Sequence, residues 1–91
     1  MSVTVEIPGP LRAFSGADAR IPLAAASVRE ALAQLERSHP SLYTSICDET
    51  GRVRRHVNVF VNTAHIRDRE GMDTPLAPGD HLIFLPSVSG G

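Results

Sequence analysis

The chain ends in two glycines that closely follow an apolar run typical of a β-strand. Gly90 and Gly91 come after residues 82–85, Leu-Ile-Phe-Leu, with a short stretch between them. Because glycine has no Cβ atom, such a pair adopts almost any backbone conformation and fits a narrow channel of another protein. This ending indicates that the reactive group is the main-chain carboxylate of Gly91, presented to a nucleotide, rather than any side chain. The alternative is an ordinary chain end, since termini are often small and polar.

The side chains offer little other chemistry. Cys47 is the only cysteine, so no internal disulfide is possible, and a small packed residue is favoured over a nucleophile. No metal-ligand spacing is present, so no metal site is expected. The histidines have no nucleophile or orienting carboxylate at a recognisable spacing, and surface positions are favoured over acid–base roles. They are His39, His56, His65 and His81.

Length and composition predict one globular domain. Ninety-one residues leave no room for two cores, so we expect a folded domain over residues 1–86 and a flexible tail over residues 87–91. Hydrophobic residues make up 42% of the chain and charged residues 21%, which is typical of a folded protein. The net charge of −1 and the scattered basic residues argue against nucleic acid as a partner.

The same composition bears on where the protein works. The chain has no long apolar run, so no membrane span is predicted, and its first residues lack the layout of a signal peptide. A single cysteine fits a reducing compartment, so a cytoplasmic location is expected. All nine basic residues are arginine, and therefore the chain cannot accept an isopeptide bond on a lysine of its own.

One helix is strongly predicted after residue 27. Ser27 and Glu30 have the spacing of a capping box, and His39-Pro40 ends the pattern. A single apolar stripe is formed by Val28, Ala31, Leu32 and Leu35. A further short helical turn is expected around residues 42–46.

Alternating apolar residues predict the strands. Pro22 makes the second of them an edge strand. Leu11 and Phe14 are expected to fold back from a loop onto the core. The expected strands cover residues 3–7, 19–23, 57–61, 65–67 and 81–85.

The order β-β-α-β-β-β indicates an α+β fold, a mixed sheet with one helix across one face. The first hairpin should be antiparallel, and the first and last strands should lie side by side in parallel. If Leu82 and Phe84 face the helix, then Ile83 and Leu85 face outward beside Phe60 and form an apolar patch for a partner. The alternative is a register shifted by one residue, which would bury Ile83 and Leu85 instead.

The sequence resembles the ubiquitin-like β-grasp sulfur carriers, the family of ThiS, MoaD and CysO, over nearly its whole length. The insertion before the third strand and the run Arg52-Val53-Arg54-Arg55 look most like CysO, whereas Ser89 departs mildly from the usual tail. The matching segments are Val3-Thr4-Val5-Glu6-Ile7-Pro8, Leu11-Arg12, Ser15-Gly16, His56-Val57-Asn58-Val59-Phe60-Val61-Asn62, Pro78-Gly79-Asp80 and Leu85-Pro86-Ser87-Val88-Ser89-Gly90-Gly91.

The resemblance implies a β-grasp carrier rather than an enzyme, with no cofactor of its own. A partner adenylyltransferase, similar to ubiquitin-activating enzymes, would use ATP and magnesium to adenylate the Gly91 carboxylate. A sulfur donor would then form a thiocarboxylate for a downstream sulfurtransferase or synthase. The tail in the partner's channel would be Ser87, Val88, Ser89 and Gly90, no protease would be needed to expose Gly91, and the free protein would be a monomer.

Two other functions stay open. The chain could be a protein modifier joined to target lysines through Gly91, or a non-covalent β-grasp interaction domain. The final sulfur acceptor is also open: an activated serine on the way to cysteine, a molybdopterin precursor, the thiazole of thiamine, a tRNA base or a specialised metabolite. Arg52, Arg54 and Arg55 could dock an acidic surface of the activating enzyme, although a solvated strand end is the favoured interpretation.

Overall fold

The computed structural model describes residues 2–14, 16 and 19–86, which form five strands, two α-helices and three 3₁₀ helices (η). The predictions for the tail, residues 87–91, and for most of the turn at 15–18 lie outside the described residues. In chain order the elements are β1 (Val3–Glu6), η1 (Gly9–Phe14), β2 (Arg20–Leu23), α1 (Val28–Ser38), α2 (Pro40–Ile46), β3 (Val57–Val61), β4 (Ala64–His65), η2 (Ile66–Asp68), η3 (Gly71–Asp73) and β5 (His81–Pro86).

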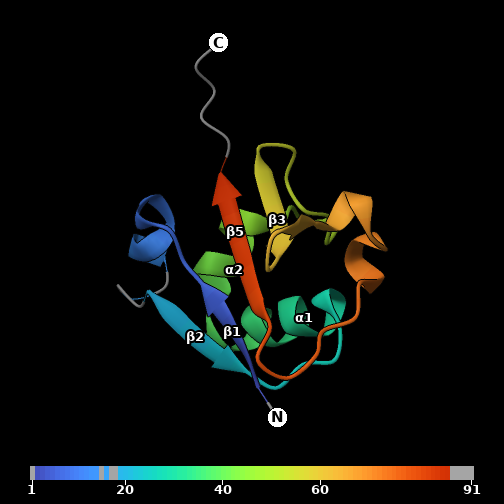
Figure 1. Ribbon diagram of the computed structural model, residues 1–91. Coiled ribbons are helices and arrows are strands. Elements are labelled where there is room, and N and C mark those ends of the chain that lie inside the picture. Colours follow the sequence, from blue (N-terminus) through green and yellow to red (C-terminus); the bar gives the residue numbers. More distant parts are fainter. Residues whose placement is uncertain (1, 15, 17–18, 87–91) are drawn as a thin grey trace.

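The strands form one mixed sheet in the order β2-β1-β5-β3-β4 (Figure 1). The predicted antiparallel hairpin of β1 and β2 is confirmed, and so is the parallel pairing of β1 with β5. β3 runs antiparallel to β5 on its other side. The edge position predicted for the strand that contains Pro22 is also confirmed. The last strand of the chain therefore lies in the middle of the sheet.

The fourth strand is shorter than predicted. Only Ala64 and His65 pair with β3, and the chain then turns into the 3₁₀ helix η2. The physical reason is a local cap: Nδ1 of His65 accepts a hydrogen bond from the backbone N–H of Arg67 at 3.1 Å. Ile66, which is 7% exposed, turns into the core at the same point.

Helix α1 begins and ends close to where the sequence predicts. The Oγ atom of Ser27 accepts a hydrogen bond from the backbone N–H of Glu30 at 3.2 Å, as expected of an N-cap. The predicted apolar stripe of α1 is buried in full. The expectation of one helix is incomplete, because the turn predicted around residues 42–46 is a second α-helix. Pro40 at its first turn starts α2, and Leu42 and Ile46 anchor it in the core.

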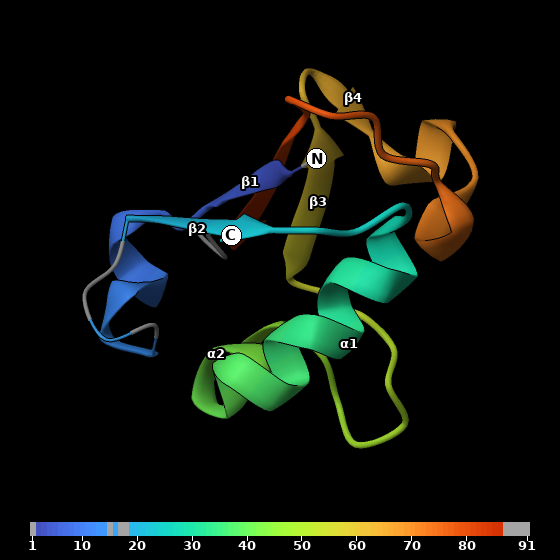
Figure 2. The same ribbon diagram turned by 90° about the horizontal axis from the view of Figure 1, so that it is seen from below.

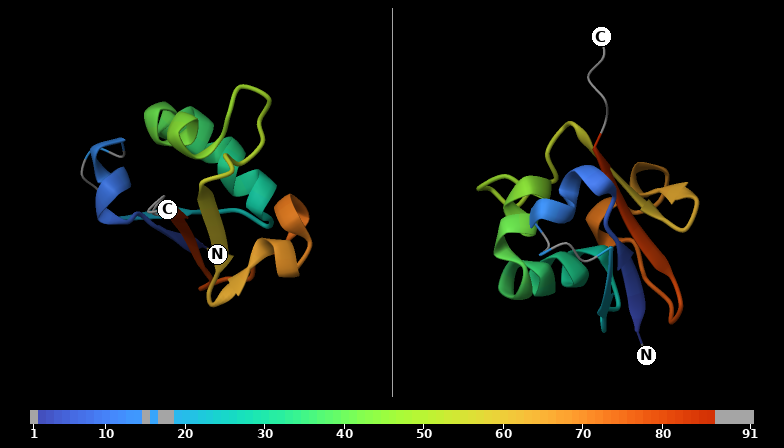
Figure 3. Two further views of the ribbon diagram at one scale, coloured as in Figure 1. Left: turned by 90° about the horizontal axis from the view of Figure 1, so that it is seen from above. Right: turned by 90° about the vertical axis from the view of Figure 1, so that its left-hand side faces the viewer.

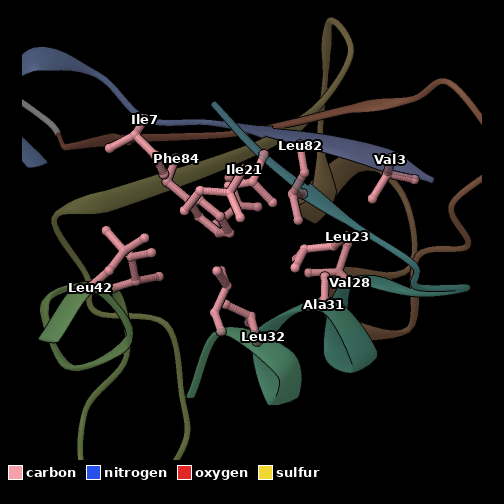
Figure 4. Close-up of a cluster of buried hydrophobic side chains, with 14 of the residues drawn as sticks. Val3, Ile7, Ile21, Leu23, Val28, Ala31, Leu32, Leu42, Leu82 and Phe84 are labelled. Atoms are coloured by element: carbon pink, nitrogen blue, oxygen red, sulfur yellow. The ribbon is translucent and has the colours of Figure 1, made fainter. Parts of the chain in front are cut away.

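Both α-helices lie on one side of the sheet, as Figures 2 and 3 show. Side chains from the strands and from both helices meet between the two layers (Figure 4). Leu82 and Phe84 of β5 are fully buried there, and Leu11 of η1 is 7% exposed, so its predicted return to the core is confirmed. The side chain of Phe14 lies outside what the structure describes.

We expect Phe84→Ala to lower the free energy of unfolding by about 3 to 5 kcal/mol, because it removes a large, fully buried ring. The matched control is Leu85→Ala on the next residue of β5. Leu85 is 41% exposed, so this change should cost only about 0.5 kcal/mol. Urea unfolding of both variants measures the difference, and equal losses would contradict the described register.

Candidate functional site

The face of the sheet opposite α1 and α2 is called the open face here. In Figure 1 it lies toward the viewer, in front of both helices. It consists of alternate residues of the strands, whose neighbours in sequence point into the core. One row of paired residues crosses all five strands. From β2 to β4 this row is Arg20, Glu6, Ile83, Phe60 and His65.

The centre of the open face is apolar. Ile83 of β5 lies directly opposite Phe60 of β3, and Leu85 follows on the same face. Phe60 and Ile83 are half-buried, and Leu85 is the large hydrophobic residue most exposed among those the structure describes. Because Leu82 and Phe84 are buried, the predicted register is confirmed and the alternative shifted by one residue is wrong.

A hollow of about 550 Å³ lies beside this apolar patch. Ile83 and Leu85 line it from β5, and Arg12 and Arg20 line it from the side of η1 and β2. The hollow thus combines apolar surface with guanidinium groups at the end of the sheet where β5 finishes.

On the β4 side, the patch is bordered by His65 and Asn58. The His65 ring meets the Phe60 ring edge to face, with ring centres 5.0 Å apart. Its Nδ1 accepts from the Arg67 backbone, so in the neutral ring the proton lies on Nε2, which donates to Oδ1 of Asn58 at 3.2 Å. Both nitrogens are therefore engaged in positioning, and the ring is held as a wall of the patch.

On the β1 side, the border is charged. Nδ1 of His81 lies 2.8 Å from Oε2 of Glu6, and Arg20 lies opposite Glu6 on β2. The open face therefore has an apolar centre and a polar rim, which is the usual arrangement of a protein–protein interface.

Asn62 and Asp80 fasten the start of β5 to the end of β3. Oδ1 of Asp80 accepts a hydrogen bond from Asn62 Nδ2 at 3.1 Å, and Oδ2 accepts one from the Ala77 backbone at 2.8 Å. Asn62 Oδ1 in turn accepts from the backbone N–H of His81 at 3.0 Å. Asn62 has φ of 57°, a conformation that asparagine tolerates better than most residues. The Ala77 and Asn62 hydrogen bonds hold the pKa of Asp80 below its ordinary value.

The predicted reactive group, Gly91, and the predicted channel residues Ser87, Val88, Ser89 and Gly90 lie outside the described residues. The structure does describe β5, the strand that precedes these residues in the chain. β5, the central strand of the sheet, ends at Pro86, next to Leu85 and the apolar patch.

Cys47 is packed, as predicted. Its side chain is 1% exposed, and burial raises the pKa of the thiol to about 11, so it is protonated at neutral pH and a poor nucleophile. Within the part of the chain that the structure describes, no group of three His, Cys, Asp or Glu residues could hold a metal ion. No described helix is long and apolar enough to cross a membrane.

The sequence interpretation missed the polar rim. Alternation in β1 places Glu6 on the outward side, but its contact with His81 joins residues 75 positions apart and depends on the pairing of the first and last strands. For His65, the pattern predicted a continuing strand, whereas its real role is to cap η2 and support Phe60. Only the pairing register brings these side chains together.

The fold and the open face together are those of a ubiquitin-like β-grasp protein. The sequence model of the ThiS family matches residues 5–91, and the chain belongs to this family. It is 31% identical, over 93 residues and the full length of both chains, to the sulfur carrier protein CysO of Mycobacterium tuberculosis.

Solved structures of related proteins have the same fold as this chain. CysO in the Amycolatopsis orientalis BexX/CysO complex superposes with a TM-score of 0.87 at 32% identity, covering 98% of this chain and 99% of that one. The small archaeal modifier protein SAMP1 of Haloferax volcanii superposes with a TM-score of 0.84 at 26% identity, covering 100% of both chains.

Because the Asp80 carboxylate accepts hydrogen bonds from Asn62 and Ala77, the free energy of unfolding should depend on pH. The folded pKa is lowered, so the contribution of the carboxylate is complete above the ordinary pKa and is lost as pH falls through the lowered value, below about pH 4. In Asp80→Asn, the NH₂ group of the new amide would face either the Ala77 backbone N–H or the Asn62 side-chain NH₂, so one of these two hydrogen bonds would be lost. We expect a loss of roughly 1 kcal/mol near neutral pH, shrinking toward pH 3, in urea unfolding at a series of pH values. A loss that does not change with pH would contradict the role given to the carboxylate.

Proposed function

We propose that this chain is a sulfur carrier protein that carries sulfur as a thiocarboxylate at Gly91. The observation that supports this most directly is the extent of the family match. The ThiS family match runs to residue 91 and so includes Gly90 and Gly91, and the identity to CysO covers the whole chain. The protein acts as a carrier on which partner enzymes work.

The loading chemistry has two steps, a substitution at the α-phosphorus of ATP and then a substitution at the terminal carboxyl carbon. A carboxylate oxygen of Gly91 attacks the α-phosphorus of ATP, which forms an acyl-adenylate and releases pyrophosphate. A sulfide equivalent then attacks the carbonyl carbon, the bond from that carbon to the bridging oxygen breaks, and the oxygen leaves with AMP. The magnesium and ATP belong to the activating partner.

The sheet would deliver this carboxylate to a partner from a fixed position. β5 is paired with β1 from His81 to Ile83 and with β3 from Leu82 to Pro86, so β3 holds its end at Pro86 in the sheet. Residues 87–91 reach at most roughly 17 Å from that point when fully extended. A partner that binds beside the end of β5 must therefore have its nucleotide site within this reach.

The open face supplies the docking surface for the activating adenylyltransferase in this proposal. Phe60, Ile83 and Leu85 give the apolar centre, and the hydrogen-bonded pair of Glu6 and His81 gives part of the rim. Apolar area buried at such a centre stabilises a complex by about 25 cal/mol per Å² before the costs of association. The hollow beside Ile83 and Leu85 would accept a side chain of the partner.

A second candidate function is protein modification through Gly91, favoured by the likeness to the archaeal modifier protein. The two functions share the adenylate and differ in the nucleophile that attacks it. Sulfide gives a thiocarboxylate, and a target lysine gives an isopeptide bond. Intact masses of cellular adducts separate them, because lysine-linked conjugates on other proteins arise only from modification.

We expect incubation with a cognate activating enzyme, ATP and sulfide to increase the intact mass by replacement of one oxygen with sulfur, localised to Gly91. Deletion of Gly91, or one residue added after it, should abolish the increase while the circular dichroism spectrum stays unchanged. The activating enzyme is first shown to be competent on another carrier. Normal loading of either variant would contradict the proposal.

For the open face, Leu85→Glu should raise the KM for the carrier in the activation reaction by roughly tenfold, which corresponds to about 1.4 kcal/mol of lost binding. The matched control is Ala33→Glu, which introduces the same side chain at an exposed position of α1, on the other side of the sheet. Pyrophosphate release measures both variants. Equal KM values for the two would place the docking surface elsewhere.

A further inference from the structure

A second surface lies beside the open face, along the β4 edge of the sheet. It is a groove of about 650 Å³ between the loop over residues 50–55 and the 3₁₀ helices η2 and η3, with part of α1 at one end. Five of the nine arginines of the chain line it, whereas no carboxylate of the described residues does. They are Arg29, Arg52, Arg54, Arg55 and Arg67. This concentration of positive charge contrasts with the net charge of −1 of the whole chain.

The loop that carries three of these arginines is held by hydrogen bonds between its own residues. Oδ1 of Asp48 accepts hydrogen bonds from the Thr50 hydroxyl at 2.6 Å, from the Thr50 backbone at 2.9 Å and from the Arg52 backbone at 3.2 Å. These bonds, led by that of the Thr50 hydroxyl, hold the pKa of Asp48 below its ordinary value. Gly51 makes the turn with φ of 84°.

The base of the loop is closed as well. Cys47 pairs with Val53 in an antiparallel bridge, and the backbone N–H of Arg54 donates to the Ile46 carbonyl at 2.8 Å. The wall of the groove is thus ordered before any partner arrives, which lowers the entropy cost of binding.

Three of the arginines keep their guanidinium groups available. Arg52, Arg55 and Arg67 are exposed and form no side-chain ion pair within the described part of the chain. The other two are engaged, because Arg29 lies 3.1 Å from Asp73 and Arg54 donates to the Thr44 carbonyl at 2.9 Å. The available charges stand on two sides of the groove, one wall formed by the loop and one by η2.

Much of the remaining lining is apolar, although Thr50, Asn58 and His65 also contribute to it. Val57, Val59 and Ile66 are buried, and Val53 and Met72 are packed against the core but partly exposed. A free phosphate would leave this apolar surface unused. The lining also contains no Phe, Tyr or Trp on which a nucleic-acid base would stack, so single-stranded nucleic acid fits it poorly.

We infer that this arginine groove binds an extended acidic segment of a partner protein. Carboxylates of the segment pair with Arg52, Arg55 and Arg67, and an aliphatic side chain lies against Val53 and Met72. Bidentate pairing of guanidinium with carboxylate supplies both strength and orientation. The inference does not depend on the chemistry of Gly91.

The groove is continuous with the open face. Asn58 and His65 line the groove and also border the apolar patch. A partner on the open face can therefore extend a chain segment around the β4 edge into the groove without leaving a gap.

The test uses the full-length chain and a fluorescent peptide of alternating glutamate and leucine, measured by fluorescence anisotropy. Arg52→Glu/Arg67→Glu reverses one charge on each wall and should weaken binding by roughly tenfold or more, as two lost charge pairs imply. The matched control, Arg37→Glu/Arg69→Glu, makes the same charge change outside the groove lining and should stay within about threefold. Amide shift changes in ¹⁵N-labelled protein should fall on residues 50–59 and 65–72.

Several outcomes would overturn the inference. They are no binding of the peptide by the wild-type chain, equal losses in the two double variants, shift changes centred elsewhere, or tighter binding of single-stranded RNA than of the peptide. Arg52→Gln/Arg67→Gln serves as a second variant without charge reversal and should weaken binding in the same direction. The circular dichroism spectra of all variants confirm that they are folded.

Discussion

The parallel pairing of β1 with β5 is the contact on which the rest of this structure depends. It joins the beginning of the chain to its last strand and places β5 between β1 and β3. Leu82 and Phe84 of β5 then reach the centre of the core, where both helices pack on them. β5 is paired with β1 as far as Ile83 and with β3 as far as Pro86, and the buried ring of Phe84 anchors the part of the strand beyond the β1 pairing.

The same pairing divides β5 into two sets of residues with different roles. Because side chains alternate across a sheet, the burial of Leu82 and Phe84 obliges Ile83 and Leu85 to face outward. Stability and recognition are thus carried by neighbouring residues of one strand. Exposed apolar residues cost solubility, and a rim of charged and polar groups on β1, β2 and β4 limits the size of the apolar patch.

Charge is distributed unevenly over the molecule, although the total is close to neutral. The arginines along the β4 edge concentrate positive potential beside the open face, whereas the opposite border carries both signs, with Glu6 beside Arg20. Such an arrangement favours one orientation of an approaching partner over others, since mismatched charges oppose the remaining orientations. The absence of lysine gives this surface guanidinium groups throughout, which are suited to paired contacts with carboxylates.

The local elements could be predicted from the sequence, because their signals lie within a few residues. The capping residues of α1, its apolar stripe and the alternation in β3 are of this kind, whereas the alternation in β5 left open whether Leu85 faces outward. The short β4, the second α-helix in full and the contact of Glu6 with His81 could not be, since each depends on what packs against it. The sequence by itself determined the apolar stripe of α1, the alternation of the strands and which chemistry the final glycines suggest. Only the tertiary structure decided which outward side chains share a surface, because that depends on strand register between residues far apart in the chain.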